Sequence, residues 1–319
     1  MLIVSIDLSF KNIYKSWHDF RRGKRFSLEI NNFENYLEEN LFDLWRDLNH
    51  NNYSHGAYSR FIVNDTKKRE IFVSGVRDRI VHRLIYNYLV DICDKTFIDD
   101  VWSNRTEKGL LKAIFKVQFF LRKFKNKYVW RSDIKKFFDS VNHTALLSAI
   151  GLKVGDNQAL EIIKKIVDSY SVNQKTGIPI GNLTSQIFSN IYFNEFDRFV
   201  KHHLKPLAYL RYGDDFIIID NKLRINNNRT RSIDFLKQNL FLSINPNNDI
   251  IIKARQGVKF LGVIITKDRV DLNNRNWQKS LENVNIQNLS SYRGLVKNFF
   301  NYEKLKYFDY NLLSKIDIK

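Results

Sequence analysis

The stretch AYLRYGDDFIIID, residues 208–220, constrains the fold of this chain more than any other. Apolar runs rich in aromatic and β-branched residues lie on both sides of a Gly-Asp pair, which predicts a β-hairpin with Asp214 and Asp215 at its tip. Turn chemistry alone explains such a hairpin without any function. Two neighbouring carboxylates, however, make each other harder to ionise, and a fold keeps such a pair mostly where a cation lies between them. A polar turn and a cation site therefore both remain open.

A third acid, Asp133, follows another strand-like run in KYVWRSDIKKFFDS. Taken alone, Asp133 or Ser132 is typical of a helix N-cap. Taken with Asp214 and Asp215, it lets two strands bring three carboxylates together, a set that can hold two Mg²⁺ ions about 3.5–4 Å apart. Magnesium prefers oxygen ligands and completes its shell with water and substrate phosphates. The three acids together predict a metal-dependent phosphoryl-transfer site.

The charge of the chain points to its partner. The formal net charge is +18, and residues 105–136 alone hold 11 basic residues against two acidic ones, Glu107 and Asp133. Such a distribution indicates a polyanion, of which nucleic acid is the commonest. An anionic membrane surface is the competing partner, but aromatic residues interleave the charges instead of forming a basic amphipathic tail. We therefore expect nucleic acid and no membrane.

Length and composition limit the remaining classes. A chain of 319 residues with 44% hydrophobic residues has room for one large domain or two to three subdomains. Its one cysteine, Cys93, excludes an internal disulfide and a cysteine-based zinc cluster. The first ten residues lack the charged start and cleavage site of a signal peptide, and no apolar stretch has membrane-spanning length. These features predict a cytoplasmic protein.

Hydrophobic periodicity predicts helices and strands that do not alternate strictly, which favours an α+β fold. Helices are expected over most of residues 1–60, and over 76–97, 108–124, 158–171, 183–204 and 291–305. Hairpins are expected at 59–75 and 208–220, a strand before Asp133, and one strand of a further hairpin at 258–266. Exposed loops or turns are expected at 171–182, 221–230 and 241–249. In the last helix, one apolar face is expected to hold Tyr292, Leu295, Val296, Phe299 and Phe300.

Several motifs in this order resemble those of reverse transcriptases. RSDIKKFFDS, GIPIGNLTSQIFSN, RYGDD and VKFLG are similar to the palm motifs, and TKKREIF, RDRIVHRLI and NRTEKGLLKAI to the finger motifs before them. The chain resembles bacterial reverse transcriptases, and IPIGNLTSQ is most similar to those of diversity-generating retroelements. Those enzymes carry a branched aliphatic residue and S-Q where retroviral and most group II intron enzymes carry Q-G and S-P. Stand-alone reverse transcriptases of anti-phage defence share the palm motifs and remain an alternative.

The resemblance implies a right-hand polymerase with fingers, palm and a short helical thumb. The regions it implies are an N-terminal helical extension at 1–60, fingers at 61–125, a palm at 126–254, and a primer grip and thumb at 255–319. Helices at 143–172 would join fingers and palm.

The resemblance also implies roles for single residues. Asp133, Asp214 and Asp215 would be the catalytic, metal-binding acids for two Mg²⁺ ions, with Mn²⁺ as a possible substitute. The incoming nucleotide would contact Lys67, Arg69, Phe138, Ile180 and Gly181, with Phe138 as a steric gate against ribonucleotides. Primer and template would contact Tyr212, Phe260, Leu261, Gly262, Arg105 and Lys108. Ordinary core packing remains an alternative for Phe138 and for residues 260–262.

Three departures from the family pattern qualify these roles. Ile180 stands where many relatives have a glutamine that contacts the nucleotide and the template, so we expect low fidelity. Gly213 makes a Y-G-D-D core familiar from viral RNA-dependent RNA polymerases, which keeps that activity as a minor alternative. SINPNND, residues 243–249, lacks the lysine common after the catalytic hairpin, which leaves a general acid for pyrophosphate unassigned.

The function implied is an RNA-directed DNA polymerase of low fidelity that copies a dedicated cellular RNA, as in a diversity-generating retroelement. The implied partners are an RNA template, a DNA or RNA primer, dNTPs and a cognate non-coding RNA. A small accessory protein or an oligomer is a further possibility. The alternatives are a defence enzyme that makes cDNA from a non-coding RNA or without a conventional template, and a catalytically silent RNA-binding scaffold.

Overall fold

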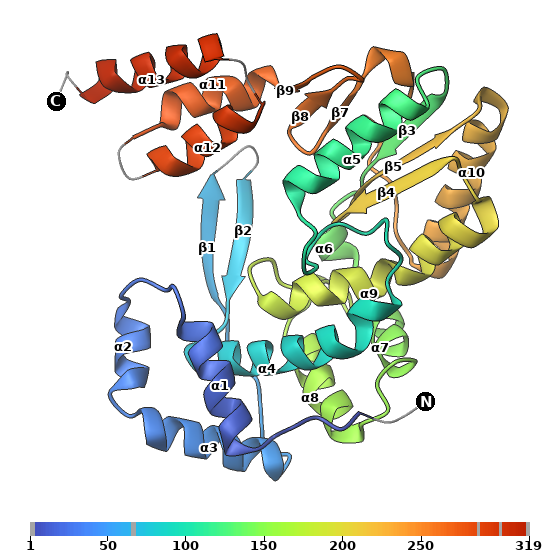
Figure 1. The fold of residues 1–319 in the computed structure, drawn as a ribbon. Helices are drawn as coiled ribbons and strands as arrows, with labels where there is room; N and C mark the ends of the chain where they lie inside the picture. Colours follow the sequence, from blue (N-terminus) through green and yellow to red (C-terminus); the bar gives the residue numbers. More distant parts are fainter. Residues whose placement is uncertain (1–3, 65–67, 286–287, 300–301, 317–319) are drawn as a thin grey trace. The chain divides into compact units, whose positions relative to one another are not determined.

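The computed structural model describes residues 4–64, 68–285, 288–299 and 302–316. The chain divides into two compact units, each built from segments that lie far apart in the sequence. Unit 1 comprises residues 1–99, 134–203 and 232–243, and unit 2 comprises residues 100–133, 204–231 and 244–319. Figure 1 labels their helices and strands.

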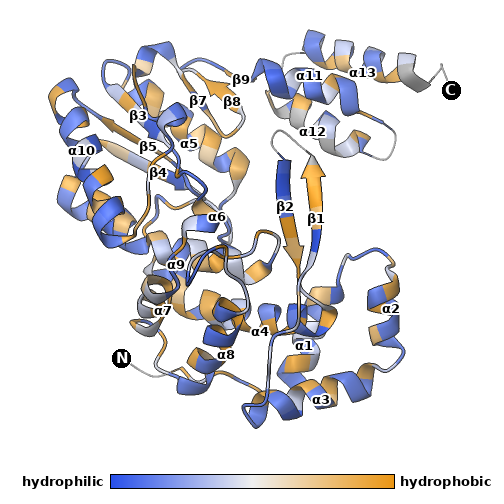
Figure 2. Cartoon of the chain, turned by 180° about the vertical axis from the view of Figure 1, so that it is seen from behind, coloured by the Kyte–Doolittle hydropathy of each residue, from blue (hydrophilic) through white to orange (hydrophobic). Residues whose placement is uncertain are grey.

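Unit 1 is mainly helical and carries one antiparallel hairpin, of strands β1 and β2. Its elements are α1 (Phe10–Arg21), α2 (Leu28–Glu34), α3 (Leu37–Asn49), β1 (Ser59–Asn64), β2 (Lys68–Val73), α4 (Val76–Cys93), α6 (Phe137–Ser140), α7 (His143–Gly151), α8 (Asn157–Asp168) and α9 (Leu183–Phe199). A π-helical turn at Val200–Leu204 follows α9. Strand β2 changes from hydrophilic at its Lys68 end to hydrophobic at its Val73 end (Figure 2).

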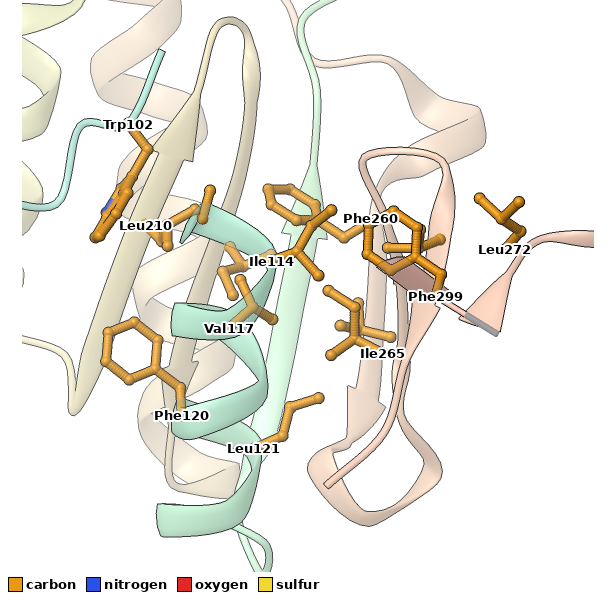
Figure 3. Packing of buried hydrophobic residues seen from close by; sticks show 14 of the residues in the cluster. Trp102, Ile114, Val117, Phe120, Leu121, Leu210, Phe260, Ile265, Leu272 and Phe299 are labelled. Atoms are coloured by element: carbon orange, nitrogen blue, oxygen red, sulfur yellow. The ribbon is translucent and has the colours of Figure 1, made fainter. Parts of the chain in front are cut away.

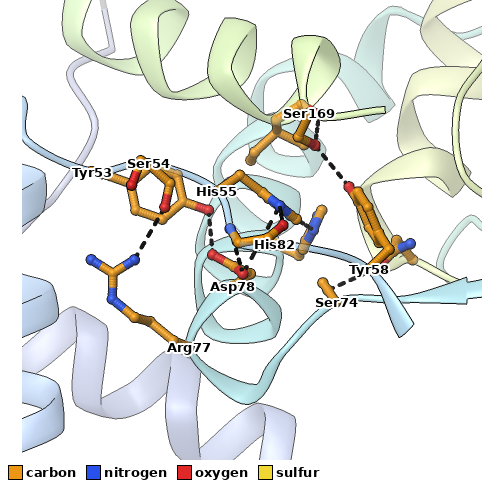
Figure 4. A network of polar contacts seen from close by, with 12 residues as sticks. Tyr53, Ser54, His55, Tyr58, Ser74, Arg77, Asp78, His82 and Ser169 are labelled. Carbon is orange, nitrogen blue, oxygen red and sulfur yellow. Dashed lines mark hydrogen bonds and ion pairs between the residues drawn. The ribbon is translucent and has the colours of Figure 1, made fainter. Parts of the chain in front are cut away.

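The core of unit 1 forms around α4, because this helix buries apolar side chains on most of its surface and packs against α1 and α9. A polar network crosses the same helix (Figure 4). The Tyr53 hydroxyl donates to Asp78 at 2.9 Å, and the ring of His82 contacts both His55 at 3.1 Å and Thr184 at 2.7 Å. Burial and the neighbouring His55 lower the pKa of His82 to about 3. These are satisfied core histidines that tie the 53–58 segment to α4 and α9.

Unit 2 contains a four-stranded antiparallel sheet in the order β4-β5-β3-β6. The strands are β3 (Tyr128–Ser132), β4 (Ala208–Tyr212), β5 (Asp215–Asp220) and β6 (Ile250–Lys253). A second, three-stranded antiparallel sheet consists of β7 (Val258–Phe260), β8 (Val263–Ile265) and β9 (Val270–Leu272). The helices are α5 (Leu110–Lys123), α10 (Lys222–Asn239), which continues into unit 1, α11 (Asn274–Asn283), α12 (Leu289–Phe299) and α13 (Tyr302–Ile316).

One hydrophobic cluster joins these elements of unit 2 (Figure 3). Helix α5 contributes Ile114 and Val117, which are fully buried against side chains of the sheet such as Leu210. The second sheet adds Phe260, and α12 adds Phe299. The four-stranded sheet is therefore fixed on one side by α5, which holds the β4–β5 hairpin in place.

Most of the predicted elements are confirmed, including both hairpins and the helices that became α4, α5, α8 and α9. In α12, Val296 and Phe299 are buried as predicted. Phe300 and the side chain of Leu295 lie outside the described residues. No helix within the described ranges combines the length and the apolarity needed to cross a membrane.

Two predictions were wrong. Residues 221–230, predicted as an exposed loop, form the first turns of α10. Its three consecutive asparagines are weak helix formers, but Ile225 and Asn228 are buried on one face, and Asn228 donates to the buried Asp220 at 2.9 Å. Residues 258–266, predicted as one strand, form both β7 and β8 around a tight turn at Leu261 and Gly262.

Candidate active site

The hairpin of β4 and β5 presents Asp214 and Asp215 at one end of the sheet. Tyr212 pairs with Asp215, so Gly213 and Asp214 form a two-residue loop. Gly213 has a φ of +64°, while Asp214 has no positive φ, the pattern of a type II′ turn. A Cβ at Gly213 would meet nothing within 4 Å, so the backbone angle rather than space requires glycine here.

The turn is held in place by residues that sequence reasoning missed. The buried Arg211 donates from Nη1 to the Gly213 carbonyl at 2.8 Å, and the Gly213 amide donates to the Ser103 hydroxyl at 2.9 Å. Residues 100–102 run along β4, with backbone hydrogen bonds from Trp102 to Arg211 and from Arg211 to Asp100. One signal was available in the sequence, because Arg211 is a charged residue inside an otherwise apolar strand. Such contacts fix the position of Asp214 and Asp215.

Strand register brings Asp133 to the same end of the sheet. Strand β3 runs antiparallel to β5, with Ser132 opposite Phe216. The next position along each strand places Asp133 beside Asp215, so the three acids come from neighbouring strands of one unit. The register thus brings the three acids to one end of the sheet, and their role as a catalytic trio stays a prediction.

The two oxygens of the Asp133 carboxylate have different surroundings. Oδ2 accepts hydrogen bonds from the side-chain amides of Asn248 at 2.9 Å and Asn245 at 3.4 Å. Oδ1 is buried and has no hydrogen-bond partner. Because a buried, unpartnered carboxylate oxygen is costly, its presence suits a ligand that binds there.

The loop that holds Asp133 is itself anchored. Arg131 donates to the side-chain oxygen of Asn248 and to the Lys259 carbonyl. Asp249 accepts from Trp130 Nε1 at 2.8 Å and forms an ion pair with Arg229, whose hydrogen bond holds the pKa of Asp249 below its usual range. The SINPNND segment, which lacks the expected lysine, thus contributes Asn248 as a partner of Asp133. Sequence reasoning missed this role because nothing in the asparagine itself distinguishes it from loop chemistry.

The chemistry of these acids fits a divalent cation. Across the described ranges, no group of three or more His, Cys, Asp or Glu side chains is arranged to hold a metal ion. What favours a cation is the end of β3, where the buried, unpartnered Oδ1 of Asp133 lies next to the hairpin that carries Asp214 and Asp215. Hard oxygen ligands of this kind suit Mg²⁺ or Mn²⁺.

Most of the predicted nucleotide-contacting residues lie together in unit 1. The amide of Phe72 in β2 donates to the Ile180 carbonyl at 2.9 Å, which places the 178–181 loop on the hairpin. Gly181 has a φ of +113°, and a Cβ there would lie 2.7 Å from Ile71 Cγ2, so the close approach to β2 already explains the glycine. Arg69 is exposed on β2. Lys67 lies outside the described residues.

Phe138 lies in the short helix α6 of the same unit and is half-buried. Its ring centroid is 5.3 Å from that of Phe137, and its carbonyl accepts from the Ile178 amide at 2.8 Å. Phe138 therefore connects through the backbone to the loop that carries Ile180. Its ring is only partly covered by protein, which leaves room for a contact with substrate.

The predicted primer and template residues lie in unit 2. Phe260 is buried in the hydrophobic cluster, as the packing alternative requires, whereas Leu261 and Gly262 form the turn, with φ angles of +50° and +83°. Asn276 donates to the Gly262 carbonyl at 2.9 Å and fixes this turn. Tyr212 is half-buried beside the acids, and burial raises the pKa of its hydroxyl.

Arg105 and Lys108 lie in the segment before α5. Arg105 Nη1 donates to the Val101 carbonyl at 3.4 Å, and Lys108 Nζ lies 4.3 Å from the centroid of the Trp102 ring. Both residues thus lie close in sequence and space to the 100–103 segment that supports the turn at Gly213 and Asp214.

Comparison with protein families shows the family of the chain. Residues 63–265, more than half of the chain, match the family described as "Reverse transcriptase (RNA-dependent DNA polymerase)". The chain belongs to the reverse transcriptase family. The match begins in β1 and ends with β8, so it contains both sets of predicted substrate residues and all three acids, while α1–α3 and α11–α13 lie outside it. Reverse transcriptases use divalent metal ions, in agreement with the donor set at Asp133.

Relatives of this reverse transcriptase include Protein YkfC of Escherichia coli, 24% identical over 64% of this chain and 64% of that protein. The group II intron-encoded protein LtrA of Lactococcus lactis is 24% identical over 52% of this chain and 29% of its own length. Among solved structures, the telomerase of Candida albicans in complex with a fragment of telomeric RNA matches 83% of this chain and 55% of its own, with a TM-score of 0.52 and 11% identity. The chain thus spans 64%, 29% and 55% of the lengths of these three proteins.

The structural likeness concerns the fold. It confirms the predicted mixture of helices and sheets and the right-hand polymerase class. The boundaries of fingers, palm and thumb stay predictions.

Proposed function

We propose that this chain is an RNA-directed DNA polymerase whose catalytic acids are Asp133, Asp214 and Asp215. The single observation that carries the proposal is the strand register that sets Asp133 beside Asp215, with the Asp133 Oδ1 buried and unpartnered. Membership of the reverse transcriptase family supports the reaction class. The RNA fragment bound in the telomerase complex supports RNA as a partner of a chain with this fold.

The three acids would hold two Mg²⁺ ions, with Mn²⁺ as a substitute. When bound, such ions activate the primer 3′-hydroxyl and neutralise charge on the leaving pyrophosphate. The protein's own part is to fix the carboxylates: Asn248 holds Asp133 Oδ2, and Arg211 holds the Gly213 carbonyl next to Asp214. Positioning and fixed charges of this kind make up most of the protein's contribution to catalysis of phosphoryl transfer.

Substrate selection would fall to unit 1. The half-buried ring of Phe138 would exclude a ribose 2′-hydroxyl, and the exposed Arg69, with Lys67, would bind the triphosphate. Ile180 offers no side-chain hydrogen bond to the nucleotide or the template, so the enzyme would tolerate mispairs. Gly181 would let the backbone approach the nucleotide.

Primer and template contacts would come from unit 2. Tyr212 would lie under the primer end, and the turn at Phe260, Leu261 and Gly262 would grip the primer. Arg105 and Lys108 would bind phosphates of the template or primer.

We place this activity in the cytoplasm, in a diversity-generating retroelement, on a cognate RNA and with a small accessory protein or an oligomer as possible partners. Cys93, the one cysteine, is buried as a free thiol, which suits a reducing compartment. Anti-phage defence is the second candidate, because the palm motifs are common to both groups. Activity on a structured cognate RNA is expected to exceed that on a generic primer-template, and equal processivity on both would count against a dedicated RNA.

The test is primer extension on poly(rA)/oligo(dT) with Mg²⁺, comparing the wild type with the variant Asp214→Ala/Asp215→Ala. We expect extension with dNTPs by the wild type only. Extension with rNTPs would point to an RNA polymerase instead. Equal extension by both proteins would show that the aspartates do not carry the reaction.

A further inference from the structure

In unit 1, α1 packs against α4 (Figure 1). Three basic residues, Lys24, Arg79 and Arg83, interact electrostatically there. Lys24 Nζ lies 4.8 Å and Arg79 Cζ 5.2 Å from the centroid of the Phe20 ring, so both cations border one aromatic side chain. Arg83 follows Arg79 by one turn of α4 and therefore shares its face. Lys24 itself is ordered by backbone contacts, because its amide and its carbonyl both bond to Arg21.

This cationic cluster (Lys24, Arg79 and Arg83) has little opposite charge around it. Arg79 forms an ion pair with Glu29, which within the described part of the chain is the only acid paired with any of the three. The Nε atoms of Arg79 and Arg83 are buried and have no hydrogen-bond partner. The guanidinium of Arg83 lies 5.8 Å from the centroid of the Tyr86 ring. Buried Nε–H groups without acceptors are costly, which suits a site completed by an anion.

The positive charges of the cluster repel one another, which makes Lys24 harder to protonate. Burial lowers the pKa of Lys24, and the charges of Arg79 and Arg83 lower it further. An anion that binds between these groups would relieve this repulsion. The cluster is accessible, because Lys24 is exposed and Arg79 and Arg83 are only partly buried.

An exposed aromatic side chain lies beside the cluster. In the loop between α1 and α2, Phe26 is 74% exposed, next to the exposed Arg25 and two residues after Lys24. Cations that neutralise phosphates, together with exposed rings on which bases stack, are the combination that binds single-stranded nucleic acid.

We propose that Lys24, Arg79 and Arg83 bind backbone phosphates of a single-stranded RNA, and that Phe26 stacks on one of its bases. The inference rests on the proposed function only in its choice of RNA as the polyanion. Lys24 and Phe26 lie outside the part of the chain that matches the reverse transcriptase family, so the site extends the RNA-binding surface beyond that domain. Partly buried guanidinium groups fixed by a helix suit single phosphates, whereas a lipid surface would ask for freely projecting cations.

The test is binding of a fluorescein-labelled oligo(rU) to the full chain, measured by fluorescence anisotropy at several salt concentrations and without nucleotides or divalent metal. Each phosphate contact to a single strand contributes about 0.7 to the slope of log K against log salt. The variant Lys24→Gln/Arg83→Gln should therefore flatten the slope by about 1.4. Within the described residues, Arg83 Nε has no hydrogen-bond partner that the fold would lose, and Lys24 Nζ lies over the Phe20 ring. This binding assay does not depend on DNA synthesis. A failure of the proposed polymerase activity and a failure of the proposed RNA site would therefore give different results.

Two exposed lysines on α1 provide the matched control. Lys11→Gln/Lys15→Gln removes the same charge from the same unit and should leave the slope close to that of the wild type. Arg83→Lys, which keeps the charge, should retain the slope. Phe26→Ala should weaken binding about 5- to 100-fold at an unchanged slope.

Two results would overturn the proposal. One is an equal slope for the cluster variant and the Lys11/Lys15 control, which would mean a diffuse charge effect. The other is an unchanged RNA slope together with lost binding to phosphatidylserine vesicles, which would make the cluster a lipid site.

Discussion

Asn248 is the residue whose removal most sharply tests how the catalytic acid is held. Its side-chain amide donates to Asp133 Oδ2 at 2.9 Å, and its oxygen accepts from Arg131. Asn248→Ala removes both contacts and leaves the carboxylate with only the longer bond from Asn245, at 3.4 Å. The backbone bond from the Asn245 amide to the Asp133 carbonyl stays in place, so the loop should keep its course.

The size of the effect follows from the kind of bond that is lost. A hydrogen bond to a charged group contributes about 1.5–3 kcal/mol, which corresponds to about a 10- to 150-fold change in an equilibrium. If this free energy serves to hold Asp133 in one orientation, kcat should fall by up to that factor. The KM for dNTP should change little, because the predicted nucleotide contacts lie in other segments. The Mg²⁺ concentration needed for half-maximal rate should rise.

The assay is single-nucleotide primer extension at varied Mg²⁺ and dNTP, and Asn247→Ala is the matched control. Asn247 lies in the same 3₁₀ turn, Pro246–Asn248, but is exposed, and only its backbone amide takes part in a hydrogen bond. We expect wild-type kinetics for Asn247→Ala. If both variants kept the wild-type kcat and Mg²⁺ dependence, the idea that Asn248 orients Asp133 would be refuted.

Four further outcomes are expected. Gly213→Ala should lower the free energy of unfolding by about 1–2 kcal/mol, because it forces a residue with a Cβ into positive φ. Gly151→Ala, at a helix end with open space around it, should not. Equal thermal unfolding midpoints for the two variants would contradict the turn assignment. Phe138→Ala should raise rNTP incorporation relative to dNTP, and unchanged discrimination would leave Phe138 as core packing. Ile180→Gln should lower misincorporation on one template, and no change would sink the low-fidelity prediction. Asp249→Asn should lower the free energy of unfolding by about 1 kcal/mol at neutral pH, because it weakens the ion pair with Arg229. The pKa of Asp249 is depressed in the fold. The stability difference between wild type and variant should therefore be fully present above pH about 4 and fade as acid protonates the folded carboxyl. A stability difference that does not depend on pH would contradict this prediction.

The local pattern of the sequence was enough to predict the two main hairpins and most helices. Alternating or continuous apolar runs and a Gly-Asp turn determine such elements from their own residues, as at β4 and β5. The pattern failed at α10, where weak helix formers are held by burial of Ile225 and by the bond from Asn228 to Asp220. Only tertiary contacts reveal that kind of stabilisation.

The three acids proposed as catalytic could be named from the sequence, but their geometry could not be predicted from it. Nothing in the sequence specifies that β3 pairs with β5 in the register that sets Asp133 beside Asp215. The supporting groups were missed for the same reason. Arg211 and Asn248 act through bonds to Gly213 and Asp133, residues that are adjacent only in the folded chain.

The measurement that tests the central claim most directly is anomalous diffraction from crystals of the chain grown with Mn²⁺, a primer-template and a non-hydrolysable dNTP. We predict Mn²⁺ peaks within bonding distance of the carboxylates of Asp133 and of Asp214 or Asp215, with one ligand from Asp133 Oδ1. Crystals of Asp133→Asn under the same conditions should lose that density. Ordered nucleotide with no Mn²⁺ at these aspartates, or the same peaks in Asp133→Asn, would contradict a metal-dependent polymerase centre at this end of the sheet.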